Sequence, residues 1–365
     1  MTRPLPPAMQ HLVDRLLTLL AQDGCTDVDF NRVALELFAF QHEHNEPYRR
    51  FCQRRGLKPG RLASWRDIPS VPISAFKDAT LSCVPPSQCE RVFMTSGTTQ
   101  GDVKGRNHHP TIAVWDLSMR SNFVRRFLHG QDRLQMLVLY PDEAEQQNSS
   151  LARYLSLAAR TFGAEGSRSY VSPRGLDVDG VCAALAAAEA SGAPVALLGA
   201  SYSFVHLLDA LQARGRRFAL PAGSRILDTG GYKGQARELA PEAFYAALES
   251  AFAVPPQRCI NMYGMTELSS QFYDEGNAQL PSVKSGPHWV RTRVLDPLSG
   301  REMAAGEPGV LAHCDLANFN SAAMILTEDV GIAVESGFLL LGRAQGAAAR
   351  GCSLAVQHFL QAARA

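Results

Sequence analysis

The apolar positions of this chain follow a helical period first and then change to short runs separated by helical stretches. Between residues 8 and 60 they recur at helical spacing, as at Val13, Leu16 and Leu20, which predicts a helical lead-in. From about residue 90 onward, short apolar runs alternate with helical stretches. The predicted strands are 134–140, 194–198, 224–227 and 258–262, and the predicted helices are 151–162, 205–211 and 241–252. Repeated alternation of strand and helix favours a largely parallel sheet covered by helices.

The pattern changes once more after residue 286. Predicted strands at 289–295, 310–313 and 338–341 indicate a smaller β-rich subdomain. The apolar positions of the last twenty residues have helical spacing, so the tail could dock on the body or on a partner. The sequence therefore predicts an α/β fold in three segments, which are the helical lead-in with the sheet core (1–285), the β-rich subdomain (286–345) and a mobile tail (346–365).

The composition is that of a globular protein. Its 365 residues are 46% hydrophobic and 19% charged, which argues against disordered and fibrous classes and, at roughly 150 residues per domain, predicts about two domains. A net charge of +1 argues against nucleic acid as a partner. Neither a signal peptide nor an apolar run long enough to cross a bilayer is found, so we expect a cytoplasmic protein. The eight cysteines lack C-x-x-C spacing, which argues against a zinc site or a disulfide framework.

The stretch 93–105 is the strongest candidate for chemistry and has the sequence F-M-T-S-G-T-T-Q-G-D-V-K-G. Its glycines let the backbone approach an anion closely, its hydroxyl and N–H groups can donate hydrogen bonds, and Lys104 supplies positive charge. The candidate anion-binding residues are Thr95, Ser96, Gly97, Thr98, Thr99 and Lys104. The same composition also fits a solvated turn between two strands.

This stretch resembles the T-S-G-T-T-G-x-P-K-G loop of the ATP-dependent adenylating enzymes, the superfamily of acyl-CoA synthetases, firefly luciferase and peptide-synthetase adenylation domains. The resemblance implies that the loop holds the β and γ phosphates of ATP. Gln100 stands where the family usually has glycine, and Val103 stands where it often has proline. Neither departure changes a residue that would bind phosphate. Both affect the mobility that the resemblance implies for the loop.

Two later turns extend the resemblance. The segment D-T-G-G-Y-K-G, residues 228–234, resembles the segment that lies against adenine in these enzymes, which assigns Gly230 and Gly231 to the base. Any tight turn can have a similar sequence. The segment Y-G-M-T-E, residues 263–267, is more specific because it matches the nucleotide motif of the family.

The roles that the family gives to this second motif transfer residue by residue. Tyr263, followed by Gly264, would stack on adenine, Thr266 would contact phosphate, and Glu267 would help to hold Mg²⁺. The chemistry requires these residue types, because a base needs a flat apolar face and a cation that bridges phosphates needs a hard oxygen ligand. A buried tyrosine followed by a glutamate that caps a helix is the structural alternative.

Two shorter fragments complete the resemblance. T-E-D-V-G resembles the family's T-G-D-x-G, whose aspartate binds the ribose hydroxyls, and this assigns Asp329 to the ribose. L-G-R resembles the sequence that opens the hinge to the C-terminal domain, and this assigns Arg343. A solvated surface aspartate or arginine would look the same, so the order of the fragments carries the argument.

The end of the chain determines which branch of the superfamily it resembles most. Only 22 residues follow Arg343, too few for the customary C-terminal domain, which we therefore expect to be missing. The helical start, the D-T-G-G-Y-K-G segment and the tail R-G-C-S-L look most like the acyl-protein synthetases of the LuxE type, which serve a fatty-acid reductase in bacterial luminescence. The phenylacetate-CoA ligases are related.

The resemblance implies a ligase that uses ATP and Mg²⁺ to convert a carboxylic acid into an acyl adenylate. That the acid is a fatty acid is also implied by the resemblance alone. A cysteine would then take the acyl group and pass it to a partner such as a reductase. Cys352 is the candidate, because Gly351 frees the backbone and Arg350 can stabilise a thiolate. An ordinary tail cysteine is the alternative. A CoA ligase and a nucleotide-binding relative without turnover also remain open as functions.

Overall fold

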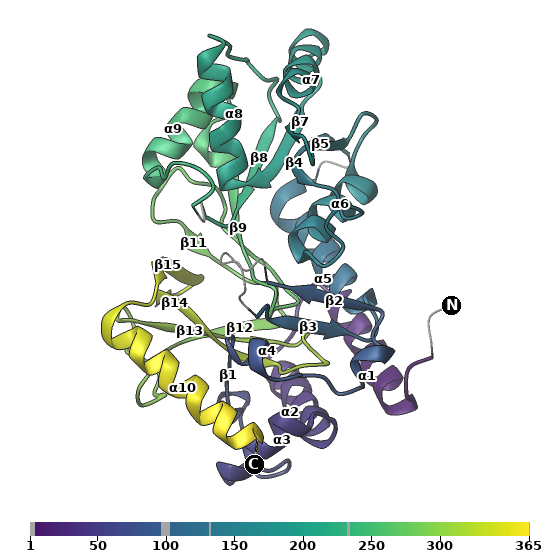
Figure 1. Cartoon of the computed structure of the whole chain (residues 1–365), viewed down its shortest axis with the longest axis vertical. Helices are drawn as coiled ribbons and strands as arrows, with labels where there is room; N and C mark the ends of the chain where they lie inside the picture. Colours follow the sequence, from purple (N-terminus) through teal and green to yellow (C-terminus); the bar gives the residue numbers. More distant parts are fainter. Residues whose placement is uncertain (1–3, 96–102, 131–132, 232–233, 365) are drawn as a thin grey trace. The chain divides into compact units, whose positions relative to one another are not determined.

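The computed structural model describes residues 4–95, 103–130, 133–231 and 234–364, which form two compact units (Figure 1). The first unit comprises Met1–Ser121, Met265–Gln271 and Val283–Ala365, and the second comprises Asn122–Gly264 and Phe272–Ser282. The units divide the chain differently from the three predicted segments, because the lead-in, the β-rich segment and the tail belong to one unit. The division also falls inside the Y-G-M-T-E motif, after Gly264.

The second unit is built on a seven-stranded sheet with the order β10-β9-β8-β7-β4-β5-β6. The five strands from β9 to β5 are parallel, and the two edge strands are antiparallel to their neighbours. The strands are β4 (Gln135–Pro141), β5 (Arg168–Ser172), β6 (Gly175–Leu176), β7 (Val195–Ala200), β8 (Arg225–Thr229), β9 (Cys259–Tyr263) and β10 (Phe272–Tyr273). A largely parallel sheet is thus confirmed.

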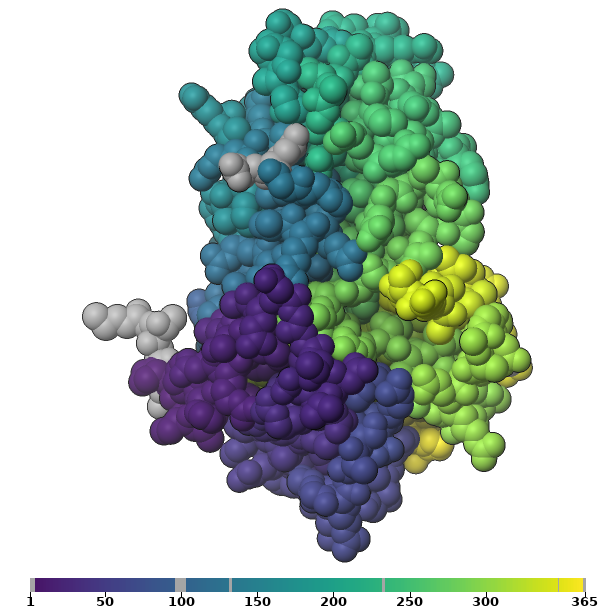
Figure 2. All heavy atoms as spheres, turned by 180° about the vertical axis from the view of Figure 1, so that it is seen from behind, coloured from purple at the N-terminus to yellow at the C-terminus, as the bar shows by residue number. Residues whose placement is uncertain are grey.

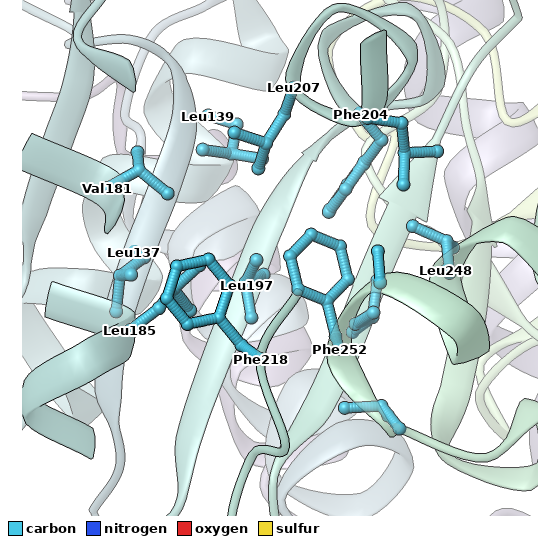
Figure 3. Packing of buried hydrophobic residues seen from close by; sticks show 14 of the residues in the cluster. Leu137, Leu139, Val181, Leu185, Leu197, Phe204, Leu207, Phe218, Leu248 and Phe252 are labelled. Atoms are coloured by element: carbon cyan, nitrogen blue, oxygen red, sulfur yellow. The ribbon is translucent and has the colours of Figure 1, made fainter. Parts of the chain in front are cut away.

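Helices cover this sheet as the predicted alternation requires. They are α6 (Ser150–Phe162), α7 (Val178–Ser191), α8 (Ser201–Ala213) and α9 (Pro241–Phe252), with a π-helical turn at Val124–Leu128 and a 3-10 turn at Pro256–Arg258. Leu137 and Leu197 point from the sheet into a core completed by Phe204, Phe218 and Phe252 (Figure 3). Each fully buried side chain of this size contributes roughly 1.5–3 kcal/mol of transfer free energy, which holds the helices against the strands.

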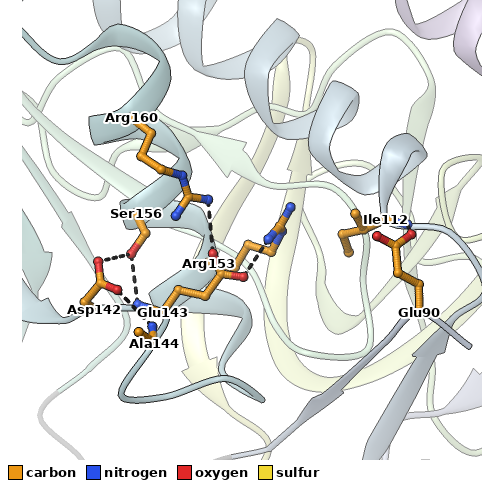
Figure 4. A network of polar contacts seen from close by, with 8 residues as sticks. All are labelled: Glu90, Ile112, Asp142, Glu143, Ala144, Arg153, Ser156 and Arg160. Atoms are coloured by element: carbon orange, nitrogen blue, oxygen red, sulfur yellow. Dashed lines mark hydrogen bonds and ion pairs between the residues drawn. The ribbon is translucent and has the colours of Figure 1, made fainter. Parts of the chain in front are cut away.

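A polar network fixes the turn that follows β4 (Figure 4). The buried carboxylate of Glu143 pairs with Arg153 at 2.5 Å and with Arg160 at 3.0 Å, both on α6. The Ser156 hydroxyl donates to Asp142 at 3.1 Å and accepts from the Glu143 backbone N–H at 3.0 Å. Breaking such a buried pair would leave an uncompensated charge, so the network ties this strand end to its helix.

The first unit combines the lead-in helices with an antiparallel sheet. Its helices are α1 (Pro7–Leu20), α2 (Asp27–His44), α3 (Glu46–Arg54), α4 (Ala75–Asp78), most of α5 (Ala113–Phe123) and α10 (Gly346–Arg364), with 3-10 turns at Trp65–Asp67 and Pro86–Gln88. The lead-in, in purple, forms a continuous part of the surface of this unit (Figure 2). In the described ranges no helix is both long enough and apolar enough to cross a membrane.

The sheet of the first unit has the order β11-β15-β14-β13-β12, and β1 pairs in parallel with β14. The strands are β1 (Val71–Pro72), β11 (Val283–Lys284), β12 (Val290–Leu295), β13 (Pro308–Asp315), β14 (Met324–Val334) and β15 (Gly337–Arg343), and a separate hairpin pairs β2 (Arg91–Met94) with β3 (Arg106–His109). The predicted strands 289–295, 310–313 and 338–341 are therefore confirmed as β12, β13 and β15. The strand β14 was not predicted, because T-E-D-V-G interrupts its apolar pattern.

Candidate functional site

The β2–β3 hairpin presents the predicted anion-binding loop. Its two ends are held together, because the Thr95 N–H donates to the Gly105 carbonyl at 3.0 Å and the Gly105 N–H donates to the Thr95 hydroxyl at 3.0 Å. Lys104 is exposed directly beside this closure. The predicted residues Ser96, Gly97, Thr98 and Thr99 lie outside the described residues. The hairpin therefore places Thr95 and Lys104 at one point of the first unit.

Glu267 lies at the same point. A Cβ atom added at Gly105 would stand 3.3 Å from Oε1 of Glu267 and 3.2 Å from Cγ2 of Thr95, so a side chain at position 105 would crowd the carboxyl group. Burial raises the pKa of Glu267 to about 7, although the nearby Arg343 opposes the shift. With only 6% of its surface exposed, the ionised carboxylate needs a cation beside it to offset the cost of burial.

The backbone that carries Thr266 and Glu267 is held by two asparagines that sequence reasoning missed. The Asn107 side-chain amide donates to the Thr266 carbonyl at 3.0 Å, and the Asn318 amide donates to the Glu267 carbonyl at 3.0 Å. Both asparagines are buried. Because these partners are 159 and 51 residues away from the motif, no local signal in the sequence could have identified them.

A buried carboxylate anchors the next turn. Asp315, at the end of β13, accepts hydrogen bonds from the Ser269 N–H at 2.9 Å and from the Ser270 N–H and hydroxyl, each at 2.8 Å. The Trp289 indole N–H donates to the same Ser270 hydroxyl at 2.9 Å. Burial raises the pKa of Asp315 to about 6. Asp315 is a positioning residue, because it fixes the segment that follows Glu267; the one signal in the sequence is an aspartate that closes the apolar run of β13.

The predicted pair Asp329 and Arg343 is brought together. These residues are register partners on β14 and β15, and Nε of Arg343 lies 3.2 Å from Oδ1 of Asp329. Arg343 also reaches Glu328 at 3.2 Å. The Thr327 hydroxyl accepts from the Asp329 N–H at 3.0 Å. Since 66% of the Arg343 side chain is exposed, the ion pair contributes little stability, and Asp329 can exchange this partner for another donor.

Cys352 lies on α10, in a different setting from the one predicted. The thiol is buried, with 5% of the residue exposed, and its Sγ is 3.9 Å from the Thr327 carbonyl oxygen. Burial, followed by the charge of Glu328, raises the pKa of Cys352 to about 11. The expectation that Arg350 would give a stabilised thiolate is therefore wrong for this arrangement, because burial and the nearby carboxylates of Glu328 and Asp329 raise the pKa of the thiol.

The glycine before Cys352 also has a different function from the one predicted. Gly351 lies inside α10, where a Cβ atom would come within 2.7 Å of Cβ of Pro297. A real Cβ does not come that close to another carbon, so this position needs glycine for the close approach of the helix to Pro297. The glycine serves packing here and does not free the backbone.

The second unit carries the remaining predicted residues at the carboxyl ends of β8 and β9. Asp228, in β8, is fully buried and accepts hydrogen bonds from the Ser201 hydroxyl at 2.9 Å, the Tyr245 hydroxyl at 3.1 Å and the Asn261 amide at 2.8 Å. These partners come from α8, α9 and β9. The Asp228 carboxylate thus connects four elements next to the Gly230 turn. The sequence did not indicate this positioning role.

The Gly230 turn and Tyr263 lie at the ends of the neighbouring strands β8 and β9. Gly230 has a φ of +70°, and among the described residues nothing lies within 4 Å of a Cβ atom placed at Gly230 or Gly231. Tyr263 closes β9 and packs against Phe272 with 5.8 Å between ring centroids. The open backbone of the turn can be approached closely by a flat ligand.

Comparison with known proteins adds independent information. A profile of the family described as acyl-protein synthetase, LuxE, matches residues 20–361. A long-chain-fatty-acid–luciferin-component ligase of Vibrio harveyi is 24% identical over 311 residues, which are 84% of this chain and 79% of that protein. The enzyme of the same name from Aliivibrio fischeri is 25% identical over 311 residues with the same coverage.

Solved structures share the fold. A structure of 2-hydroxyisobutyryl-CoA ligase in the postadenylation state, in complex with 2-HIB-AMP, superposes with a TM-score of 0.63 at 15% identity and covers 94% of this chain and 73% of that one. An open conformation of the same ligase, with 2-HIB-AMP and CoA, gives a TM-score of 0.61 at 16% identity over 87% of this chain and 69% of that one. At these identities the likeness concerns the fold alone.

Proposed function

Because the chain belongs to the acyl-protein synthetase family LuxE, we propose that it activates a carboxylic acid with ATP and transfers the acyl group to a thiol. The observation that supports this most directly is the position of the Glu267 carboxyl group at the closed end of the anion-binding loop, 3.3 Å from a Cβ placed on Gly105. The names of the two relatives support a long-chain fatty acid as the acid. An enzyme that uses ATP in this way would act in the cytoplasm.

In the first half of the proposed reaction, a carboxylate oxygen of the acid attacks the α-phosphorus of ATP. A bond forms between that oxygen and phosphorus, the bond from phosphorus to the bridging oxygen breaks, and pyrophosphate leaves with the electron pair. Lys104 and the hydroxyls of Thr95 and Thr266 would bind the phosphate oxygens, and Asp329 would bind the ribose. Positioning and charge neutralisation supply most of the catalysis in such a step.

The buried carboxylate of Glu267 fits a magnesium ion. Among the described residues no group of three His, Cys, Asp or Glu side chains could hold a metal by itself. Mg²⁺ commonly binds through one or two carboxylates together with substrate phosphates, so a single carboxylate beside a phosphate loop suits it. Bound there, the ion would offset phosphate charge. Glu267 would hold it, and the cation would in turn offset the burial of that carboxylate.

The raised pKa of Glu267 predicts a pH dependence. In the folded protein the carboxyl keeps its proton up to about pH 7, whereas the ordinary value is 4.5, so a proton must leave before the cation binds. The apparent KM for MgATP should therefore fall about tenfold between about pH 6 and pH 8. Exchange kinetics over this range would measure it, and Glu267→Gln should remove the additional step. A wild-type profile identical to that of the variant would contradict the assignment.

In the second half, the thiol of Cys352 would lose its proton to water and its sulfur would attack the acyl carbon. The bond from the acyl carbon to the phosphate oxygen breaks and AMP leaves, which produces a thioester on the enzyme. Because the thiol is buried and its pKa is raised to about 11, α10 must leave its docked position before this step. A reductase or another acceptor protein would then receive the acyl group by thioester exchange.

An acyl-CoA ligase is the second candidate. The burial of Cys352 favours it, because an external thiol would need no movement of α10. One incubation separates the candidates: the protein with MgATP and labelled acids, with and without CoA, followed by mass spectrometry of protein and small molecules. We expect a protein-bound acyl group without CoA. Acyl-CoA formed only when CoA is present would replace the first candidate by the second, and no AMP formation with any acid would refute both.

A further inference from the structure

The connection between β13 and β14 is buried along its whole length. Residues 316–323 join the two strands, and each of them is at most 3% exposed. Connections without regular structure normally lie on the surface, because in the interior their backbone N–H and C=O groups lose water and need other partners. This connection therefore depends on hydrogen bonds from other parts of the first unit.

Gln41, on the lead-in helix α2, supplies three of these bonds. Its Nε2 donates to the carbonyl oxygens of Asn318 and Phe319, each at 3.0 Å. Its Oε1 accepts from the Ala323 N–H at 2.9 Å. Gln41 is fully buried and follows Leu37 by one helical turn on the apolar face of α2. A buried amide is costly unless it is hydrogen-bonded, and here both ends of the connection provide its partners.

The same connection holds the segment that carries Glu267. The Asn318 side-chain amide donates to the Glu267 carbonyl at 3.0 Å and to the Ala322 carbonyl at 2.8 Å. Its oxygen accepts from the hydroxyl of Ser269 at 3.2 Å and from that of Ser321 at 3.1 Å. Because both amide N–H groups of Asn318 are used, the orientation of this side chain is determined by its neighbours.

Two hydrogen bonds in series thus lead from α2 to Glu267. Gln41 fixes the backbone of Asn318, and the Asn318 side chain fixes the Glu267 carbonyl. The Glu267 side chain is itself buried, so it has little room to adjust when its backbone shifts. Mg²⁺ demands nearly ideal octahedral geometry at short distances, and a displaced carboxylate would hold it poorly.

We propose that Gln41 is a positioning residue for Glu267 and acts on it through the backbone and the side chain of Asn318. The inference rests on the proposed function, because that function gives the Glu267 carboxylate its task. It makes the helical lead-in part of the scaffold of the active site. No local pattern in the sequence indicates this role, since the partners of Gln41 are 277 to 282 residues away.

The test is a double-mutant cycle. Gln41→Met keeps the length of the side chain and removes its hydrogen bonds. It should lower kcat/KM for MgATP in acid-dependent ATP–pyrophosphate exchange about tenfold and leave the KM for the acid unchanged. In the Glu267→Gln background the same substitution should cost less than about twofold, because the carboxylate that Gln41 positions is already absent.

The matched control is Asn277→Leu in the second unit. Asn277 is buried and its amide donates to the Cys259 carbonyl at 2.6 Å, so this change also replaces a buried amide by an apolar side chain of similar shape. It should lower the melting temperature as Gln41→Met does. Its effect on exchange should be the same in the wild-type and Glu267→Gln backgrounds.

Asn45→Ser is the milder variant, and it decides the question where Gln41→Met does not fold. The Asn45 amide donates to the Ser321 carbonyl at 2.7 Å, and its oxygen accepts from the Tyr48 N–H at 3.4 Å as the N-cap of α3. Serine keeps the cap and loses the bond to the connection. Its effect on exchange should be smaller than that of Gln41→Met and should likewise disappear in the Glu267→Gln background.

The outcomes separate this inference from the proposed function. Additive effects of Gln41→Met and Glu267→Gln, or an equal rise of KM for MgATP and for the acid, would overturn the positioning role and leave the function intact. A wild type without exchange would contradict the proposed function. Amide hydrogen exchange of residues 266–270 then tests the positioning by itself, since it should be faster in Gln41→Met and not in Asn277→Leu. An unchanged rate in Gln41→Met would overturn the role.

Discussion

Alanine in place of Lys104 or Glu267 is expected to lower acid-dependent ATP–pyrophosphate exchange about a hundredfold. Removal of a charged phosphate or metal contact from a site with little water costs about 3 kcal/mol of transition-state stabilisation, which corresponds to this factor. Glu267 is almost fully buried and Lys104 stands beside the closed end of the hairpin, so both changes act at one place in the first unit. Radiolabelled pyrophosphate exchange with a medium-chain or long-chain fatty acid measures the effect.

Two controls make the result specific. Circular dichroism should show that Lys104→Ala leaves the fold unchanged, since Lys104 is exposed. Glu267→Gln keeps the shape of the side chain and should lose activity as Glu267→Ala does. Lys58→Ala removes another exposed lysine of the same unit and should leave exchange at the wild-type rate. Wild-type exchange in both Lys104→Ala and Glu267→Ala would show that the nucleotide site has been assigned to the wrong residues.

Much of the fold follows from periodicity alone. The predicted helix 241–252 coincides with α9. The predicted strands 134–140 and 258–262 match β4 and β9 except that each begins and ends one residue earlier. These segments carry their burial pattern locally, so pattern reasoning finds them. The strand β14 escaped prediction because its order comes from pairing with β13 and β15, while T-E-D-V-G gives it a polar and glycine-containing sequence.

Residues of the candidate site that belong to a motif could be proposed from the sequence, whereas residues that position them through distant contacts could not. Thr266 and Glu267 follow from a motif, but Asn107 and Asn318, which hold their carbonyls, come from parts of the chain that no local pattern connects to it. The positioning roles of Asp228 and Asp315 could likewise not be predicted, because a buried carboxylate is recognised only by the hydrogen-bond donors around it.

Cys352 shows the same limit. Its neighbours in the sequence are glycine, arginine and serine, which suggest an exposed thiol, yet the packing of Phe359 on Phe51 buries that face of α10. The two phenylalanines are more than three hundred residues apart in the sequence, so the raised pKa of the thiol is a tertiary effect. In the docked arrangement the thiol is buried, so the proposed acylation of Cys352 would require its release.

Cys352→Ser is expected to keep pyrophosphate exchange and to lose the hydroxylamine-labile acyl group on the protein completely. In the proposed mechanism, adenylation uses the first-unit residues around Glu267, whereas thioester formation needs the sulfur nucleophile. Incubation with MgATP and labelled acid, followed by peptide mass spectrometry, measures the adduct. Cys25→Ser, which alters a more exposed thiol of the same unit, is the control and should be acylated like wild type.

Thiol labelling tests the required release of α10. With its pKa raised from 9.0 to about 11, the thiolate fraction of Cys352 at neutral pH is about a hundredfold smaller than that of an ordinary cysteine, so iodoacetamide should label it slowly in the resting protein. Phe359→Ala removes the ring that packs on Phe51 and should speed the labelling, because loss of a buried phenylalanine destabilises the docked helix by about 3–5 kcal/mol.

Persistence of the adduct in Cys352→Ser, or its mapping to Cys314 or Cys259, would refute the acyl role of Cys352 while leaving adenylation intact.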